Sequence, residues 1–203
     1  MARVILASAS PRRKQLLEEM GFEVHVLSVS IDETQYALES PREYLYRVVR
    51  LKISAALGVT ALEGEAEAEW THQIAAETPV LAADTIVCFD ENVLQKPSDD
   101  ADARRMLQML SGRSHEVVTR FAIARQGFWH EQSVATLVTF RCISDVEIDE
   151  YVRTAEGRDK AGSYAIQGRA AKFVRKINGS YGAVVGLPSC EVSEALAHAL
   201  ARP

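Results

Sequence analysis

The chain lacks the features that mark secreted, zinc-binding and membrane proteins. It has three cysteines, Cys88, Cys142 and Cys190, which are widely spaced and form no Cys-x-x-Cys pair. Their odd number and spacing argue against a disulfide framework and a structural zinc site. No apolar run approaches the roughly 18 residues of a membrane-spanning helix, and the first residues lead into a strand pattern rather than a signal peptide. We therefore expect a cytoplasmic protein that makes no membrane contact.

Positive charge is also scarce. The 23 lysines and arginines are outnumbered by 28 aspartates and glutamates, which gives a formal net charge of −5. A general nucleic-acid-binding protein usually carries a strongly basic surface, so we expect no nucleic-acid partner. The five histidines are scattered without the spacing of metal ligands. A local basic cluster in such an acidic protein is still able to bind a small anionic ligand.

The sequence does contain an alternation of strand and helix patterns that is typical of an α/β fold. Its 203 residues suit one domain, 1–203, with a substantial core. Residues 60–77 carry five glutamates without a sustained apolar period, which predicts an exposed acidic insertion. The predicted strands are 4–7, 23–29, 79–83 with its continuation 86–89, 93–94, 116–125, 129–141 and 171–177. The predicted helices are 12–20, 42–56, 99–112, 145–154 and one that begins at Ser189 or Ser193 and ends at Leu200.

The segment from Ser8 to Arg13 predicts an anion site. It follows a short strand pattern and leads into a helix, whose first turn has free N–H groups and the positive end of the helix dipole. Either Ser8 or Ser10 is able to cap that helix, and Pro11 suits its first position. The guanidinium groups of Arg12 and Arg13 match phosphate oxygens. The alternative is an ordinary helix cap followed by two solvated arginines.

Asp84 and Thr85 form a polar pair inside an otherwise apolar strand. A buried carboxylate needs a compensating cation, so Asp84 is a candidate general base or metal ligand, with Lys52 and Lys96 as candidate partners. Glu33, just past a strand, is able to join Asp84 on a divalent metal. The alternatives are that Asp84 caps a turn, that the lysines are solvated, and that Glu33 is an ordinary loop acid.

Two segments rich in glycine follow downstream. Residues 159–168 combine small residues with Gln167, whose amide both donates and accepts hydrogen bonds, and this favours close approach to a base edge. The alternative is a tight polar turn between strands. Residues 179–188 are typical of loops that lead into the last helix.

In this order, these pieces resemble the Maf family of nucleoside triphosphate pyrophosphatases. The resemblance covers nearly the whole chain, and the acidic insertion is its main departure. The residues that carry it are Ala7 to Arg13, Glu33, Lys52, Ala82 to Val87, Lys96-Pro97, Leu110 to His115, Asp159 to Tyr164, Ile166 to Gly168 and Val185 to Pro188.

The resemblance implies a fold of the Maf/ITPase-like class: a mixed, strongly bent sheet flanked by helices, in two lobes with the nucleotide in a central cleft. It also implies hydrolysis of a nucleoside triphosphate to the monophosphate and pyrophosphate with a divalent metal, Mg²⁺ or Mn²⁺, in a possible homodimer. Asp84 matches the residue that acts as the family's proton acceptor. Arg12, Thr85 and Gln167 match positions linked to base choice.

The Asp-Thr pair and the Tyr-x-Ile-Gln-Gly motif are similar to the branch that acts on dTTP and UTP. The Gln167 amide is able to pair with the O4 and N3–H edge of uracil or thymine, a pairing that rejects bases which leave polar groups unsatisfied. The alternatives are house-cleaning of modified nucleotides, hydrolysis of 7-methyl-GTP, and a nucleotide-binding regulator of septum formation without turnover.

The resulting hypothesis assigns a role to each candidate residue. Asp84 and Glu33 hold the metal, and Asp84 orients or deprotonates the water that attacks the α-phosphorus. Cationic side chains bind the triphosphate and stabilise the charge of the departing pyrophosphate. The predicted catalytic residues are Asp84, Glu33, Lys52 and Lys96, and the predicted substrate-binding residues are Ser8, Ser10, Arg12, Arg13, Thr85 and Gln167.

Overall fold

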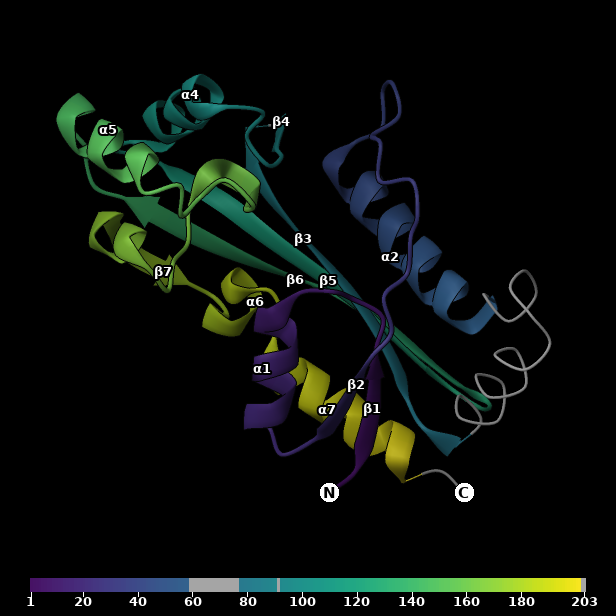
Figure 1. Ribbon diagram of the computed structural model, residues 1–203. Coiled ribbons are helices and arrows are strands. Elements are labelled where there is room, and N and C mark those ends of the chain that lie inside the picture. Colours follow the sequence, from purple (N-terminus) through teal and green to yellow (C-terminus); the bar gives the residue numbers. More distant parts are fainter. Residues whose placement is uncertain (59–76, 91, 202–203) are drawn as a thin grey trace. The chain divides into compact units, whose positions relative to one another are not determined.

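The strands of the computed structural model, which describes residues 1–58, 77–90 and 92–201, form one mixed sheet (Figure 1). They are β1 (Arg3–Leu6), β2 (Glu23–Val26), β3 (Val80–Phe89), β4 (Asn92–Leu94), β5 (Ser114–Arg125), β6 (Phe128–Phe140) and β7 (Val174–Asn178). Their order in this seven-stranded sheet is β2-β1-β3-β5-β6-β7, and β4 pairs with β3. β1 is parallel to both β2 and β3, whereas β4 is antiparallel to β3 and β7 to β6.

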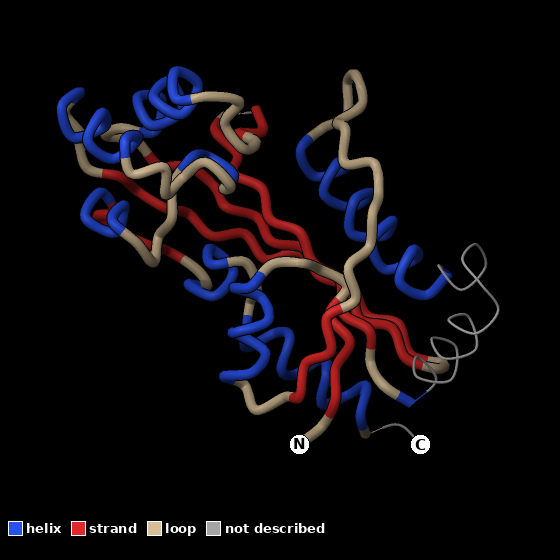
Figure 2. Tube along the Cα trace, in the orientation of Figure 1, coloured by secondary structure: helices blue, strands red, loops and turns tan. Residues whose placement is uncertain are grey.

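Helices flank the strands, as the blue and red segments of Figure 2 show. The α-helices are α1 (Pro11–Glu19), α2 (Pro41–Gly58), α4 (Asp100–Leu110), α5 (Asp145–Arg153), α6 (Tyr181–Val185) and α7 (Ser189–Leu200), and η2 (Ala161–Ser163) and η3 (Arg169–Phe173) are 3₁₀ helices. In the described part of the chain, no helix is long and apolar enough to cross a membrane. The mixed sheet and its helices confirm the predicted α/β class, and the strong bend and the central cleft stay predictions.

Local sequence explains where several helices begin. Asp99 caps α4, because its carboxylate accepts a 2.8 Å hydrogen bond from the Asp102 N–H. Ser144 and Glu147 cap α5 reciprocally, each side chain bonding the backbone N–H of the other residue. Pro11 occupies the first turn of α1, where its missing N–H has no structural cost.

The chain folds into two compact units. Unit 1 comprises Met1–Asp84, Arg120–Ser133 and Gly186–Pro203, and unit 2 comprises Thr85–Thr119 and Val134–Val185. In unit 1, Leu17 of α1 and Leu196 of α7 join Leu6 and Leu81 in one buried cluster, so these two helices cover one face of the strands. Alternate strand residues such as Ala82 point to the other face, on which Figure 1 shows α2.

Three parts of the structure differ from the predicted elements. The strand predicted over 23–29 ends at Val26. The strand predicted over 171–177 begins later, because residues 169–173 form η3. Residues 181–185, predicted as a loop, form α6, whose start is fixed by a hydrogen bond from the Ala183 N–H to the Ser180 hydroxyl. The predicted acidic insertion lies outside the described residues except for its last one.

An aromatic cluster with a buried histidine lies in unit 2. The His115 Nε2 atom lies 2.8 Å from the Tyr164 hydroxyl, and the His115 ring meets those of Tyr164 and Phe140 edge to face. Only 2% of His115 is exposed, and burial lowers its pKa to about 4. Burial also raises the pKa of the Tyr164 hydroxyl, so both partners are neutral near pH 7.

Acidification should therefore destabilise the protein through His115. Between pH 6.5 and pH 4 the unfolded chain binds a proton at this residue that the folded chain does not, so the free energy of unfolding falls as the pH falls. The full loss is on the order of 3 kcal/mol and is complete below about pH 4. Urea denaturation at pH 7.0 and pH 4.5 measures it.

His115→Gln should reduce this difference between the two pH values, since glutamine does not titrate. The exposed His198, changed to Gln in the same way, is the matched control. The prediction is contradicted if the free energy of unfolding of His115→Gln decreases between pH 7.0 and pH 4.5 by as much as that of the wild type.

Candidate active site

Along β3, the polar pair Asp84 and Thr85 lies between the segment that pairs with β1 and the segment that pairs with β4. β3 pairs with β1 at Val80 and Leu81, and with β4 from Val87 to Phe89. Asp84 and Thr85 lie between these two pairings, where a strand is able to present polar side chains to a ligand. Because successive side chains alternate in direction, the two residues point to opposite faces of β3.

Asp84 belongs to a cluster of four charged side chains in unit 1. The Lys52 Nζ atom of α2 lies 2.9 Å from Asp84 Oδ1 and 2.8 Å from Glu33 Oε1, and Arg13 Nη2 lies 3.8 Å from Asp84 Oδ1. The side chains of Lys52 and Asp84 are 10% and 16% exposed, whereas that of Glu33 is 47% exposed. The cluster therefore places one carboxylate and two cations in a mostly buried space, with the Glu33 carboxylate at its exposed edge, and this balance of charge is what burial requires.

Arg13 organises the loop before α1 rather than facing solvent. Its Nε donates to the Gly186 carbonyl oxygen at 2.9 Å, and its Nη1 donates to the Ser8 hydroxyl at 3.0 Å. Burial lowers the pKa of this guanidinium, an effect that the neighbouring Asp84 charge opposes. The Ser8 hydroxyl also accepts a bond from the Ser10 N–H. Ser10 is the N-cap residue of α1, but its side chain makes no capping hydrogen bond. The prediction that the Ser10 hydroxyl caps this helix is therefore wrong.

Two further groups surround this cluster. The Nε atom of Arg12 is buried and has no hydrogen-bond partner among the described residues. Since buried donors are normally satisfied, this atom is a natural partner for an anionic ligand. Tyr44 of α2 is buried, and burial together with the Asp84 and Glu33 charges raises its pKa to about 12.

Thr85 belongs to unit 2, where it meets another hydroxyl. Its Oγ1 atom lies 2.7 Å from that of Thr119 on β5, and the Thr119 hydroxyl donates to the Ala183 carbonyl oxygen of α6 at 2.6 Å. Thr119 is fully buried and Thr85 is half-buried.

The segment around Gln167 is held from both sides by α5 and the residues after it. The Tyr151 hydroxyl accepts a 3.0 Å bond from the Ala165 N–H and donates to Glu156 Oε1 at 3.1 Å. Glu156 accepts the Arg169 N–H at 2.9 Å. Both backbone flanks of the exposed Gln167 side chain are thereby fixed, and a side chain at position 168 would collide with the Glu156 carboxylate.

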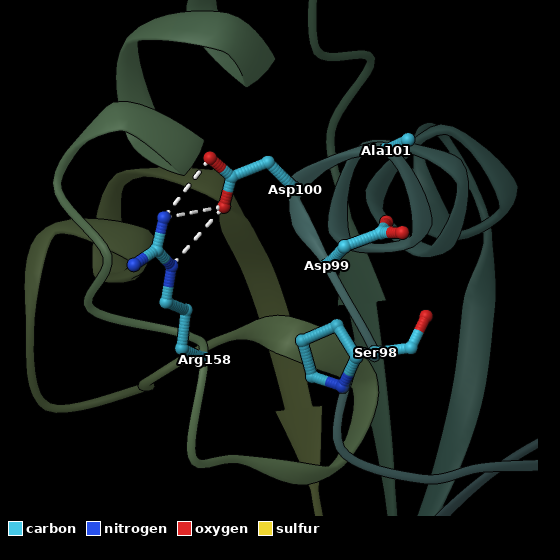
Figure 3. Close-up of a pocket in the computed structure, with 6 residues that line it drawn as sticks. Ser98, Asp99, Asp100, Ala101 and Arg158 are labelled. Carbon is cyan, nitrogen blue, oxygen red and sulfur yellow. Dashed lines mark hydrogen bonds and ion pairs between the residues drawn. The ribbon is translucent and has the colours of Figure 1, made fainter.

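Lys96 is exposed and follows β4, and the next residue, Pro97, lines a hollow of about 630 Å³ whose lining residues Figure 3 draws. In Figure 3, Arg158 reaches across to Asp100, and the two make a bidentate ion pair with a shortest distance of 2.8 Å. The carbonyl oxygen of Gln95 accepts the Gly162 N–H at 3.2 Å, so the Lys96 segment adjoins the start of the Gln167 segment. The hollow is lined by Pro97, Ser98, Asp99, Asp100, Ala101 and Arg158, none of which was predicted as a site residue.

The structure thus brings part of the predicted site together. Ser8, Arg13, Glu33, Lys52 and Asp84 form one connected network of unit 1. Sequence reasoning missed Tyr44, Thr119, Tyr151 and Glu156. Of these, only Thr119 carries a signal in the sequence, a lone hydroxyl within the apolar run of β5, which is the same signal that singles out Asp84.

Comparisons with known proteins relate this chain to a family. The family model described as "Maf-like protein" matches residues 3–199. The solved structure of the Ham1 protein of Staphylococcus aureus aligns with 97% of this chain and 98% of its own, at 12% identity and a TM-score of 0.45.

Curated relatives are similar over nearly their full length. A protein of Vibrio cholerae named dTTP/UTP pyrophosphatase is 43% identical over 97% of this chain and 97% of its own. A protein of Salmonella typhimurium with the same name is 43% identical over 98% of this chain and 93% of its own. Because the family model and these relatives match nearly every part of the sequence, including the segments that build the charged cluster, the chain belongs to the Maf family.

Proposed function

We propose that this chain hydrolyses dTTP and UTP to the nucleoside monophosphate and pyrophosphate, the activity that the names of its relatives give for those proteins. The observation that carries the proposal is the charged cluster around Asp84. A carboxylate held by Lys52 in the middle of a strand, beside Glu33 and a buried arginine, is what hydrolysis of a phosphoanhydride needs at its centre.

Asp84 acts on the attacking water. Lys52 and Arg13 both approach Oδ1, at 2.9 and 3.8 Å, so Oδ2 is the oxygen that we assign to the water. From that atom the carboxylate orients the water toward the α-phosphorus and accepts its proton. Lys52 and Arg13 keep the carboxylate in one orientation while this happens.

The carboxylates of the cluster fit a divalent metal. Glu33 and Asp84 each place one oxygen within 2.9 Å of Lys52 Nζ, so the two carboxylates lie close together around the Lys52 ammonium, and a divalent metal would use their other oxygens. Mg²⁺ is typically held by one or two carboxylates together with substrate phosphates, and Mn²⁺ accepts the same oxygen ligands. Glu33 and Asp84 would hold the ion, which when bound neutralises phosphate charge.

The two adjacent arginines have different roles in the site. Arg12 has a buried Nε atom without a partner in the described part of the chain, so we assign it to the phosphate oxygens together with Ser10 and Lys96. Arg13 donates to Ser8 and to the Gly186 carbonyl, so its role is to position Asp84 and the loop.

The base is selected in unit 2. The exposed Gln167 amide pairs with the O4 and N3–H edge of uracil or thymine, and the backbone on both sides of it is fixed by Tyr151 and Glu156. Thr85 contributes a hydroxyl to the same recognition.

Asp84→Asn should abolish turnover without unfolding the protein. The amide keeps the shape of the carboxylate but is unable to accept the proton, so kcat for UTP should fall about 10²- to 10⁴-fold. Asp145→Asn, at an exposed position in α5, is the matched control and should retain wild-type kcat. Turnover within twofold of wild type in a folded Asp84→Asn variant would remove Asp84 from the mechanism.

Pyrophosphate release should depend on both base and metal. We expect release from dTTP, UTP and methylated UTP in Mg²⁺ or Mn²⁺, little from CTP or 7-methyl-GTP, and loss of activity on chelation that added metal restores. The readout is pyrophosphate released per minute over this nucleotide panel. A preference for 7-methyl-GTP would overturn the base assignment, and nucleotide binding without release would favour a regulator.

Alanine at the two arginines should have different consequences. Arg13→Ala removes a buried guanidinium from the Ser8, Gly186 and Asp84 contacts, so the free energy of unfolding should fall by about 3 kcal/mol. Arg12→Ala should raise KM for UTP about 10- to 100-fold and leave stability nearly unchanged. Lys14→Ala, at the exposed next position of α1, controls for the helix itself. Equal loss of stability in both arginine variants would contradict this division.

A further inference from the structure

Glu33 lies on a long loop that connects β2 to α2. Residues 27–40 form no helix or strand, and the Glu33 side chain is 47% exposed. Its carboxylate lies 2.8 Å from Lys52 Nζ, but a glutamate side chain has several rotatable bonds, so an ion pair at its tip leaves the backbone that carries it free to move. A fixed place for this carboxylate beside Asp84 therefore requires that the loop backbone be held as well.

The side chain of Arg47 in α2 holds this backbone immediately after Glu33. Its Nη2 atom donates to the Thr34 carbonyl oxygen at 2.8 Å. The same guanidinium makes a bidentate ion pair with Glu39 near the end of the loop: Nε donates to Oε1 at 2.7 Å and Nη2 to Oε2 at 2.8 Å. The side chains of Arg47 and Glu39 are 18% and 9% exposed, so water competes little for these charged hydrogen bonds.

The turn between these two points is closed around the same guanidinium. The Tyr36 ring stacks on it, with 3.9 Å between Arg47 Cζ and the ring centroid. The Tyr36 N–H donates to Glu39 Oε2 at 3.1 Å, and the Gln35 amide donates to the Glu39 carbonyl oxygen at 2.9 Å. Leu38 adopts a left-handed conformation, with φ of 67°, and its side chain is fully exposed. Because packing of that side chain does not offset the strain, the contacts around Arg47 are what hold the turn.

α2 thereby fixes Glu33 at two points. Lys52 contacts the tip of the side chain, and Arg47, five residues earlier on the same helix, binds the carbonyl of the next residue in the loop. Both cations belong to one regular element of unit 1, so their separation does not change when the loop moves. Lys52 also lies 2.9 Å from Asp84 Oδ1, so the loop that Arg47 holds places the two carboxylates together.

We propose that Arg47 is a positioning residue of the candidate active site, which holds the Glu33 carboxylate beside Lys52 and Asp84 through the backbone of the loop. The inference rests on the proposed function and deepens it, because it adds a residue on which the geometry of the hydrolytic site depends. Loss of Arg47 frees the Thr34 carbonyl, so Glu33 samples positions away from Asp84. A displacement of about 1 Å at a reacting centre is enough to slow a reaction about 100-fold.

Arg50, one turn further along α2, separates this role from packing. It makes the same kinds of contact: a bidentate ion pair with Glu131, at 3.2 and 2.8 Å, and a contact with the Tyr46 ring at 4.5 Å from its centroid. Glu131 lies on β6, however, so Arg50 connects α2 to the sheet rather than to the loop of Glu33. Arg50→Ala is therefore the matched control.

The test measures kcat and KM for pyrophosphate release from UTP by the full chain in Mg²⁺. Arg47→Ala should lower kcat about 10- to 100-fold with a smaller change in KM, and Arg50→Ala should leave kcat within about twofold of wild type. Glu33→Gln should also lower kcat. In the double variant Glu33→Gln/Arg47→Ala, loss of Arg47 should lower kcat no further, because a residue that acts through Glu33 then has nothing to position. A residue that only stabilises the fold lowers kcat equally in both backgrounds.

Hydrogen exchange reports on the loop without nucleotide or turnover. In Arg47→Ala the amides of residues 27–40, followed by mass spectrometry, should exchange faster than in the wild type, whereas those of α4 should be unchanged. Arg50→Ala should exchange like the wild type over 27–40. If Arg47→Ala fails to fold, Arg47→Lys keeps the positive charge and the long stem but loses the planar fork, and it should show the same changes at smaller size.

The outcomes separate this inference from the proposed function. If the wild type releases pyrophosphate from UTP and folded Arg47→Ala, or Arg47→Lys in its place, keeps kcat within about twofold of wild type, the role of Arg47 is overturned and the proposed function stands. Losses that multiply in the double variant, or loop amides that exchange at the wild-type rate in Arg47→Ala, overturn that role equally. A wild type that releases no pyrophosphate from UTP or dTTP overturns both.

Discussion

The constraint on which the structure depends is a carboxylate in the middle of an apolar strand. An ionised Asp84 at 16% exposure would destabilise the fold by several kcal/mol without cations beside it. Lys52 supplies the main compensation at 2.9 Å and also binds Glu33, while Arg13 approaches the same oxygen. Thus α2, the loop after β2 and the start of α1 are fixed in place by a single side chain of β3.

The same constraint changes the role that we assign to the loop between β1 and α1. As a helix start with two arginines it is a general anion site, but one of those arginines is buried and bonded to Ser8 and Gly186. The Gly186 carbonyl belongs to the turn before α7, so Arg13 connects the two chain segments that flank the core cluster of unit 1. The loop therefore holds the carboxylate in place and leaves Arg12 as the arginine for a ligand.

Sequence predicts what depends on neighbouring residues. The starts of α4 and α5, the strand interrupted by Asp84 and the pairing of Asp84 with Lys52 all follow from local pattern or charge compensation, and the structure contains them. It does not predict α6, because five residues carry too little periodicity, nor η3, whose Phe173 is buried in a turn that resembles a strand in sequence. The burial of Arg13 depends on a carbonyl 173 residues away, which no local pattern contains.

At two places in this site, adjacent residues make different contacts because of the direction in which the backbone turns their side chains. Side chains alternate by 180° along a strand, so Asp84 meets Lys52 while Thr85 meets Thr119. Side chains advance by about 100° along a helix, so Arg13 turns into the protein while Arg12 keeps an unpaired donor among the described residues. Substitutions at neighbouring positions therefore act on different contacts. A change at Thr85 alters the contact with Thr119 and leaves Asp84 bonded to Lys52.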